Sequence, residues 1–276
     1  MRLIILASLL ASVTSCATFD RQGAADTLAV RGGLQRSLVK TDPFTLTTYS
    51  RLATPGRPVT IYIEGDGLAW LDRNRVSPDP TPRNPVALDL ASHDRSANVA
   101  YLARPCQYTE PRFNPRCTEV YWTDRRFSEE VVASMNAAVE QIKRGASADT
   151  VHLVGYSGGG AVATLIAARR KDVASLRTVA GNLDHEAVNA HHGVSPMRGS
   201  LNPIDVAGAA STIPQLHFSG SLDTVVPSVI ARDYAKRAAN PACIQVVTVE
   251  GATHADGWSE RWPDLLKMPV ECRARP

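Results

Sequence analysis

Three residues of this 276-residue chain have the types and sequence contexts that acyl-transfer chemistry needs, namely Ser157, Asp223 and His254. A serine hydroxyl is a poor nucleophile at neutral pH unless a base lies within hydrogen-bond reach, and a histidine base needs an acid that fixes its tautomer. Each of the three residues follows a short apolar or β-branched run that is typical of a buried strand. Because the carboxyl ends of parallel strands meet at one edge of a sheet, we expect the three side chains to form one site.

The segment around Ser157 reads VHLVGYSGGGAVATL over residues 151–165. An apolar run is followed by a glycine-rich turn and then by small apolar residues with helical spacing. Strand, sharp turn and helix is the context in which G-x-S-x-G forms a nucleophile elbow. The backbone N–H of Gly158 then lies at a helix N-terminus, which favours negative charge, so we expect Gly158 to donate to an oxyanion.

The same glycines also fit a dinucleotide-binding turn, which needs a second strand ending in an acid about twenty residues later. Asp172 has nearly this spacing, but its surroundings (ARRKDVA) lack the pattern of a buried strand. We therefore interpret the turn as an elbow and expect no organic cofactor. An oxidoreductase that binds a nucleotide is kept as a rival interpretation.

The acid has two candidates. Asp223 follows a strand predicted at residues 213–218, and Asp184 follows another at residues 176–180. Asp223 is preferred, because it gives the chain order serine, acid, histidine that occurs in one class of hydrolases.

The base has several candidates. His254 follows the last predicted strand, at residues 244–249. The alternatives are His217, which falls inside a strand and is expected to be a packed residue, and His185, His191 and His192 in a loop region. No acid matches these histidines at a metal-ligand spacing, so we expect no metal site.

A second oxyanion donor is expected in the turn Glu64-Gly65-Asp66-Gly67, directly after a β-branched and aromatic run at residues 59–63. Glycine-rich turns after an early strand supply this donor in enzymes with a nucleophile elbow. We assign the backbone N–H of Gly67 or, as the alternative, of Asp66. A turn without any catalytic role is the other interpretation.

The segments GYSGG, GSLDTVVP and EGATH together resemble the nucleophile, acid and histidine motifs of the α/β-hydrolase superfamily, over residues 44–260. Within it the chain is similar to bacterial envelope hydrolases that carry an IYIEGDG strand end. The resemblance implies hydrolysis of a carboxylic ester or related acyl bond in a small-molecule substrate. A peptidase, a thioesterase and a non-catalytic binding lipoprotein on the same fold are the alternatives.

Strands alternating with helices predict the fold class α/β, with a doubly wound, mainly parallel sheet and a short cap insertion at residues 185–210. The expected strands are 44–51, 59–63, 98–104, 151–154, 176–180, 213–218 and 244–249, and the expected helices are 85–93, 128–144, 161–168 and 229–239. The Pro-rich stretch at residues 68–85 is expected to be an irregular loop.

The first residues have a pattern that is typical of a targeting segment. Residues 1–15 combine one arginine with a short apolar run and end in Val-Thr-Ser before Cys16, which resembles a bacterial lipobox. We predict a lipoprotein signal peptide at 1–15, a lipidated Cys16, a tether and N-terminal segment at 16–40 and a hydrolase domain at 41–276. A lipid on Cys16 would hold the protein on the membrane of the cell envelope, on the periplasmic side. Because Ala17 is not an inner-membrane retention signal, we expect the outer membrane. A plain secretory signal is the alternative.

Four cysteines follow Cys16, and an even number behind a signal peptide indicates disulfides. Three pairings are possible, of which the local one, Cys106–Cys117 and Cys243–Cys272, is the most economical. The net charge is only +3 and shows no basic stripe, so we expect no nucleic-acid partner. Oligomeric state is not predicted.

Overall fold

The computed structural model describes residues 20–273, in which eight strands form one sheet in the order β1-β2-β6-β3-β7-β8-β9-β10. β1 and β6 each pair with β2 antiparallel, and all other neighbours are parallel. The predicted mainly parallel sheet is therefore confirmed. The bounds are β1 Gln35–Lys40, β2 Thr45–Leu52, β3 Val59–Ile63, β6 Asn98–Leu102, β7 Val151–Tyr156, β8 Val173–Val179, β9 Gln215–Gly220 and β10 Ile244–Val249.

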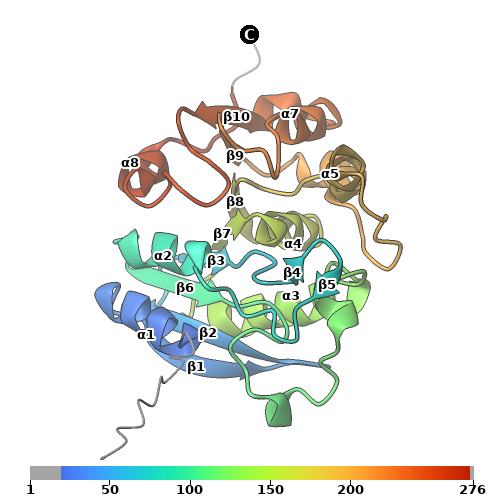
Figure 1. The fold of residues 1–276 in the computed structure, drawn as a ribbon. Coiled ribbons are helices and arrows are strands. Elements are labelled where there is room, and N and C mark those ends of the chain that lie inside the picture. Colours follow the sequence, from blue (N-terminus) through green and yellow to red (C-terminus); the bar gives the residue numbers. More distant parts are fainter. Residues whose placement is uncertain (1–19, 274–276) are drawn as a thin grey trace, which may run out of the picture.

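Helices cover both faces of the sheet, as Figure 1 shows. On one face α2 packs on β3, β6 and β7 and contacts α1 and α8. On the other, α4 packs on β7 and β8 and contacts α3. The bounds are α1 Arg21–Arg31, α2 Val86–His93, α3 Glu129–Gly145, α4 Gly158–Ala167, α5 His185–His192, α6 Ala207–Ala210, α7 Val229–Lys236 and α8 Trp262–Lys267.

Strand β3 illustrates how the sheet separates two cores. All five of its residues are buried. Ile61 and Ile63 pack in the core that contains α3 and α4, whereas Tyr62 packs in the core that contains α2 and Trp262. Successive side chains of a strand point to opposite faces, so a strand covered on both faces is apolar throughout. This is why the run VTIYI predicts a central strand.

Three local predictions need correction. Residues 35–40 lie in the predicted tether but form β1, the edge strand, so the folded domain begins before residue 41. The Pro-rich loop contains a small hairpin, β4 (Trp70–Asp72) with β5 (Arg75–Val76). β8 begins at Val173, three residues before the predicted start. The segment between β8 and β9 contains α5 and α6, and corresponds to the predicted short cap insertion.

Of the three possible disulfide pairings the structure contains the local one, with Cys106 bonded to Cys117 and Cys243 to Cys272. The predicted signal peptide and Cys16 lie outside the described residues. No helix in the described part of the chain combines the length and the apolar character needed to span a bilayer.

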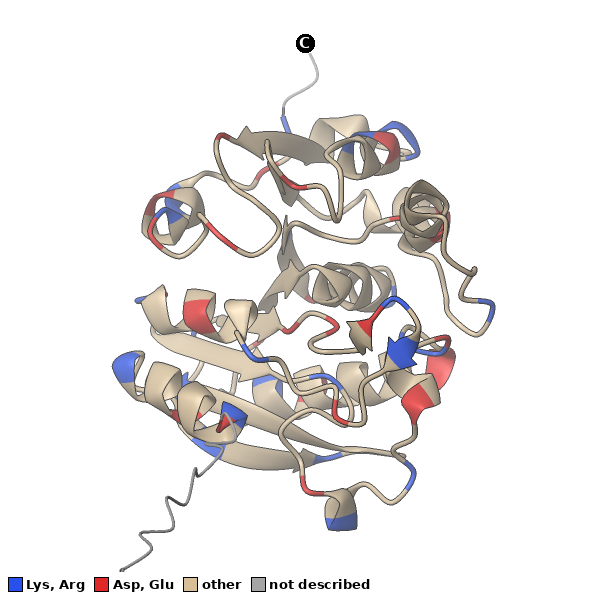
Figure 2. Ribbon diagram, in the orientation of Figure 1, with Lys and Arg blue, Asp and Glu red and all other residues tan. Residues whose placement is uncertain are grey.

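Charged residues of both signs are interspersed over the helices and loops (Figure 2). Most lie at the surface, but Glu64 and Arg104 are buried, with 1% and 4% of their surface exposed. Burying a charged side chain is costly unless it is paired and hydrogen-bonded. Both residues lie beside the turn that follows β3, which is where the candidate site is found.

Candidate active site

Ser157 lies between β7 and α4 in a backbone conformation that side chains rarely adopt, with φ 51° and ψ −120°. The turn is possible because two glycines allow close backbone contacts. A side chain at Gly155 would collide with Gly159 and Gly160 of the helix, and one at Gly159 would collide with the carbonyl oxygen of Ile63 in β3. The predicted elbow geometry is therefore present, with the serine at the carboxyl edge of the sheet.

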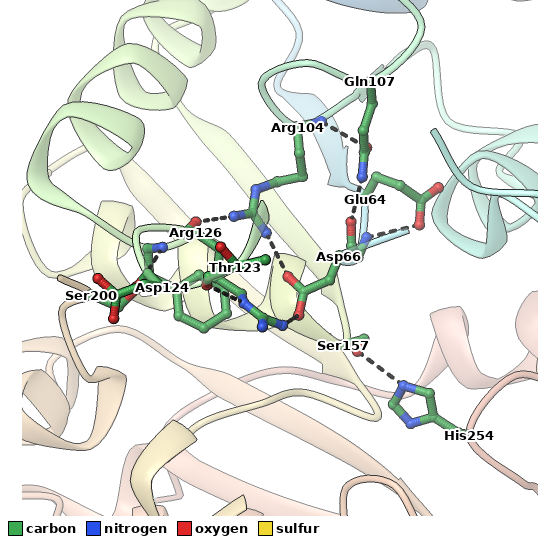
Figure 3. A network of polar contacts seen from close by, with 12 residues as sticks. Glu64, Asp66, Arg104, Gln107, Thr123, Asp124, Arg126, Ser157, Ser200 and His254 are labelled. Carbon is green, nitrogen blue, oxygen red and sulfur yellow. Dashed lines mark hydrogen bonds and ion pairs between the residues drawn. The ribbon is translucent and has the colours of Figure 1, made fainter. Parts of the chain in front are cut away.

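The structure brings together the three residues that the sequence singles out. His254 Nε2 lies 2.9 Å from Ser157 Oγ, and His254 Nδ1 lies 2.9 Å from Asp223 Oδ2. The hydrogen bond between Ser157 and His254 is drawn in Figure 3. With a proton on Nδ1, the imidazole donates to Asp223 and accepts from the serine hydroxyl, which is the arrangement of an activated nucleophile.

The acid and the base are themselves held in place. Asp223 has a fully buried side chain, and its Oδ1 accepts from the backbone N–H groups of Val225 and Val226, each at 2.9 Å. Its Oδ2 is left for His254. The carbonyl oxygen of His254 accepts from Trp258 Nε1 at 3.0 Å and from the Tyr156 hydroxyl at 3.2 Å. The first two bonds hold the carboxylate of Asp223, and the other two hold the backbone that carries His254.

Asp223 and Asp184, the alternative acid, have different hydrogen-bond partners in the structure. Asp184 is the N-cap of α5, where its Oδ1 accepts from the backbone N–H groups of Glu186 and Ala187. The same oxygen accepts from Asn202 Nδ2 at 2.8 Å. These partners give Asp184 a structural task, and His254 bonds to Asp223 instead.

The other histidines have other surroundings. His217 is buried in β9 between Thr178 and Gln215, and burial lowers its pKa to about 3, so it stays neutral as a packed residue. His192 Nε2 lies 2.8 Å from the carbonyl oxygen of Val225. His185 is buried beside Phe127, and both of its ring nitrogens are without a partner among the described residues. The structure places only His254 against Ser157.

Two segments beside the elbow contain backbone N–H groups without an acceptor among the described residues. At the start of α4, the N–H of Gly158 has no acceptor among residues 20–273. In the turn after β3, the N–H groups of Asp66 and Gly67 are also free within that range. Gly65 and Asp66 lie against Ser157 and Gly158, whereas Gly67 lies against Pro80 and Gln107. The carboxylate of Asp66 thus lies against Gly158, whereas Gly67 packs on the other side of the turn.

Two arginines bind the Asp66 side chain, and sequence reasoning missed both. Arg126 Nη1 lies 2.8 Å from Asp66 Oδ2, and Arg104 Nη1 lies 3.3 Å from Asp66 Oδ1, as Figure 3 shows. Burial acts to raise the pKa of Asp66, but the two guanidinium groups, Arg126 foremost, hold it below its usual value. Asp66 is thus an anion beside the nucleophile.

Glu64 precedes this turn and is the second unexpected carboxyl group. Its Oε1 accepts from the backbone N–H of Gly65 at 2.8 Å and lies 3.5 Å from that of Ala87 in α2. Burial raises the pKa of Glu64 to about 7, against an ordinary value of 4.5. Within the described residues, no three His, Cys, Asp or Glu side chains lie close enough together to hold a metal ion.

The sequence matches no family model and no curated protein. The fold, in contrast, is similar to that of several solved structures. The chain is similar to Est1E from Butyrivibrio proteoclasticus, with TM-score 0.59, 16% identity, 84% of this chain covered and 96% of that one. It is similar to the esterase Pf2001 from Pyrococcus furiosus, with TM-score 0.61, 11% identity and coverage of 86% and 92%.

An α/β serine hydrolase homologue from Coxiella burnetii is a third similar structure, with TM-score 0.57, 18% identity and coverage of 83% of this chain and 92% of that one. At these identities the similarity shows the fold. It extends over most of the chain.

The two candidate acids form a matched pair for mutation. Asp223→Asn should lower the rate at which Ser157 reacts with 4-nitrophenyl acetate about 10³- to 10⁴-fold, because the imidazole then has the wrong tautomer. Asp184→Asn should leave this rate within about twofold and should cost at most about 1 kcal/mol of stability through the helix cap. Nitrophenolate release and thermal melting measure the two effects. Equal rate losses in both variants would contradict the assignment of Asp223.

The raised pKa of Glu64 predicts a pH-dependent stability. The folded protein keeps a proton on Glu64 that the unfolded chain releases near pH 4.5. The contribution of this protonated side chain to stability is therefore full below pH 4.5 and is lost as pH rises through 7. The side chain of Glu64→Gln is neutral at every pH. The free energy of unfolding of this variant minus that of the wild type should therefore increase between pH 5 and 8, by up to about 3 kcal/mol. Urea titrations measure this difference, with the exposed Glu119→Gln as control. A difference that does not change with pH would refute the assignment.

Proposed function

We propose, from the α/β-hydrolase fold of this chain and the geometry around Ser157, that the protein is a serine hydrolase of carboxylic esters or related acyl bonds. The observation that carries the proposal is the chain of hydrogen bonds from Ser157 Oγ through His254 to Asp223, at 2.9 Å for both steps. One of the similar structures is an esterase and another is a serine hydrolase homologue. The kind of enzyme that these structures represent supports the reaction class.

In the first step Ser157 Oγ attacks the carbonyl carbon of the substrate while its proton moves to His254 Nε2. The imidazolium that forms is stabilised by the buried carboxylate of Asp223, whose side chain is fully shielded from water. The proton then passes from His254 to the leaving alcohol as the C–O bond breaks. The product is an acyl group on Ser157.

The negative oxygen of the tetrahedral intermediate needs donors that are already oriented. The backbone N–H of Gly158 is one, at the start of α4. For the second we infer the backbone N–H of Asp66, since Gly65 and Asp66 lie against the elbow and Gly67 lies against Pro80. Both groups are free of other acceptors among the described residues.

In the second step a water molecule takes the place of the alcohol. His254 removes a proton from the water, which attacks the acyl carbon, and the same donors stabilise the second intermediate. His254 then returns the proton to Ser157 Oγ as the acid product leaves. No cofactor is required for either step.

The site of action is part of the proposal. The lipobox-like sequence before Cys16 supports a lipid anchor at the outer membrane, with the domain on the periplasmic side. The two disulfides support an oxidising compartment. The insertion between β8 and β9 has only short helices, which supports a small-molecule ester rather than a substrate that needs a large lid.

Reaction with a fluorophosphonate probe tests the proposed function, because the probe phosphonylates a serine only when a base activates it. The purified wild type should gain the mass of one adduct, and the adduct should be absent from Ser157→Ala. The exposed Ser37→Ala on edge strand β1 is the matched control and should be labelled like the wild type. A folded wild type without an adduct, or an adduct that persists in Ser157→Ala, would contradict the proposal.

A further inference from the structure

The side chain of Asp66 presents an electrostatic problem for the reaction. It packs so closely on the elbow that any side chain at Gly158 would collide with its carboxylate. The oxyanion of the intermediate would form at the N–H of the same Gly158. Two negative charges in this partly buried region repel each other, and the repulsion grows as water is excluded. An isolated Asp66 carboxylate would therefore oppose catalysis.

The two arginines reverse the sign of this local charge. Arg126 and Arg104 each bind one oxygen of Asp66, so the three side chains carry a net charge of +1 beside the elbow. The guanidinium of Arg126 also donates from Nε to the carbonyl oxygen of Thr123 at 2.8 Å. Arg104 donates to the carbonyl oxygen of Arg126 and lies over the ring of Phe127. Both arginines are thus rigidly held.

The peptide between Gly65 and Asp66 is fixed at both ends. Gln107 Nε2 donates to the carbonyl oxygen of Gly65 at 3.0 Å, and Gln107 Oε1 accepts from the backbone N–H of Arg104 at 3.1 Å. In a trans peptide the C=O and N–H groups point in opposite directions. Binding the Gly65 carbonyl therefore sets the direction of the Asp66 N–H, while the arginines hold the Asp66 side chain (Figure 3).

We propose that Arg126 and Arg104 are positioning residues that act through Asp66 on the oxyanion hole. They hold the second donor of the hole in place and replace the repulsion of the Asp66 carboxylate by a net attraction for the oxyanion. The inference rests on the proposed function, since it concerns the intermediate of that reaction. It differs from a substrate-binding role for the arginines, because the bound group is the protein's own carboxylate.

Arg126→Met tests the inference in the full-length protein. With 4-nitrophenyl acetate, kcat should fall about 10- to 100-fold, less than for complete loss of a donor because Arg104 stays in place. KM should change by no more than about twofold, because ground-state binding does not use the arginine. Arg126→Lys keeps the charge and should recover part of the lost kcat. The neighbouring Arg125→Met is the matched control, since Arg125 is half exposed and pairs with Glu130 away from the site.

A double-mutant cycle shows whether the arginine acts through Asp66. Asp66→Asn keeps the backbone N–H but removes the carboxylate, and in this background Arg126→Met should change kcat by no more than about threefold. Thermal melting shows that each variant is folded. If the wild type is labelled at Ser157 by the fluorophosphonate probe, an unchanged kcat in folded Arg126→Met, or a rise in KM alone, would overturn the inference. A folded wild type that the probe does not label would instead overturn the proposed function, and with it the inference.

Discussion

The close contact between helix α4 and the sheet is the constraint on which the site depends. Glycines at positions 155 and 159 let the helix backbone approach β7 and the carbonyl oxygen of Ile63 in β3. The chain can then leave β7, turn through the strained Ser157 and enter α4 within a single residue. This contact places the serine at the carboxyl edge of the sheet, next to the turn that follows β3 and opposite the loop that carries His254. Any side chain at either glycine would push the helix away and separate these groups.

Two carboxylates close to the nucleophile have different tasks because their partners differ. Within residues 20–273, Asp223 has no charged partner other than the imidazole of His254, so its charge is available to stabilise an imidazolium. Asp66 is bound by two guanidinium groups, so its charge is more than balanced and the region near Gly158 is electropositive. A negative charge is thus kept behind the base, and a positive one near the developing oxyanion. This separation of charge is what the proposed acyl transfer through His254 requires.

The sequence predicts the central features because they are local. The strand, turn and helix around Ser157 are encoded in one continuous segment, and Asp223 and His254 each follow an apolar strand. Arg104 and Arg126 were missed because both lie in irregular segments, where no periodicity indicates which side chains point inward. β1 was missed because QRSLVK is mostly exposed at the edge of the sheet and lacks a strand pattern. The proposed preference for Asp66 over Gly67 rests on the packing of Gly67 against Pro80 and Gln107, which the sequence alone does not indicate.

The most direct test of the site is a crystal structure of the phosphonylated protein, because the phosphonyl group has the tetrahedral shape of the intermediate and a polarised oxygen in the place of the oxyanion. Phosphorus should be bonded to Ser157 Oγ, and one phosphonyl oxygen should lie about 3 Å from the backbone nitrogens of both Gly158 and Asp66. His254 should keep its hydrogen bond to Asp223. A phosphonyl oxygen that points into solvent, or phosphorus on any other residue, would contradict the catalytic role assigned to this site.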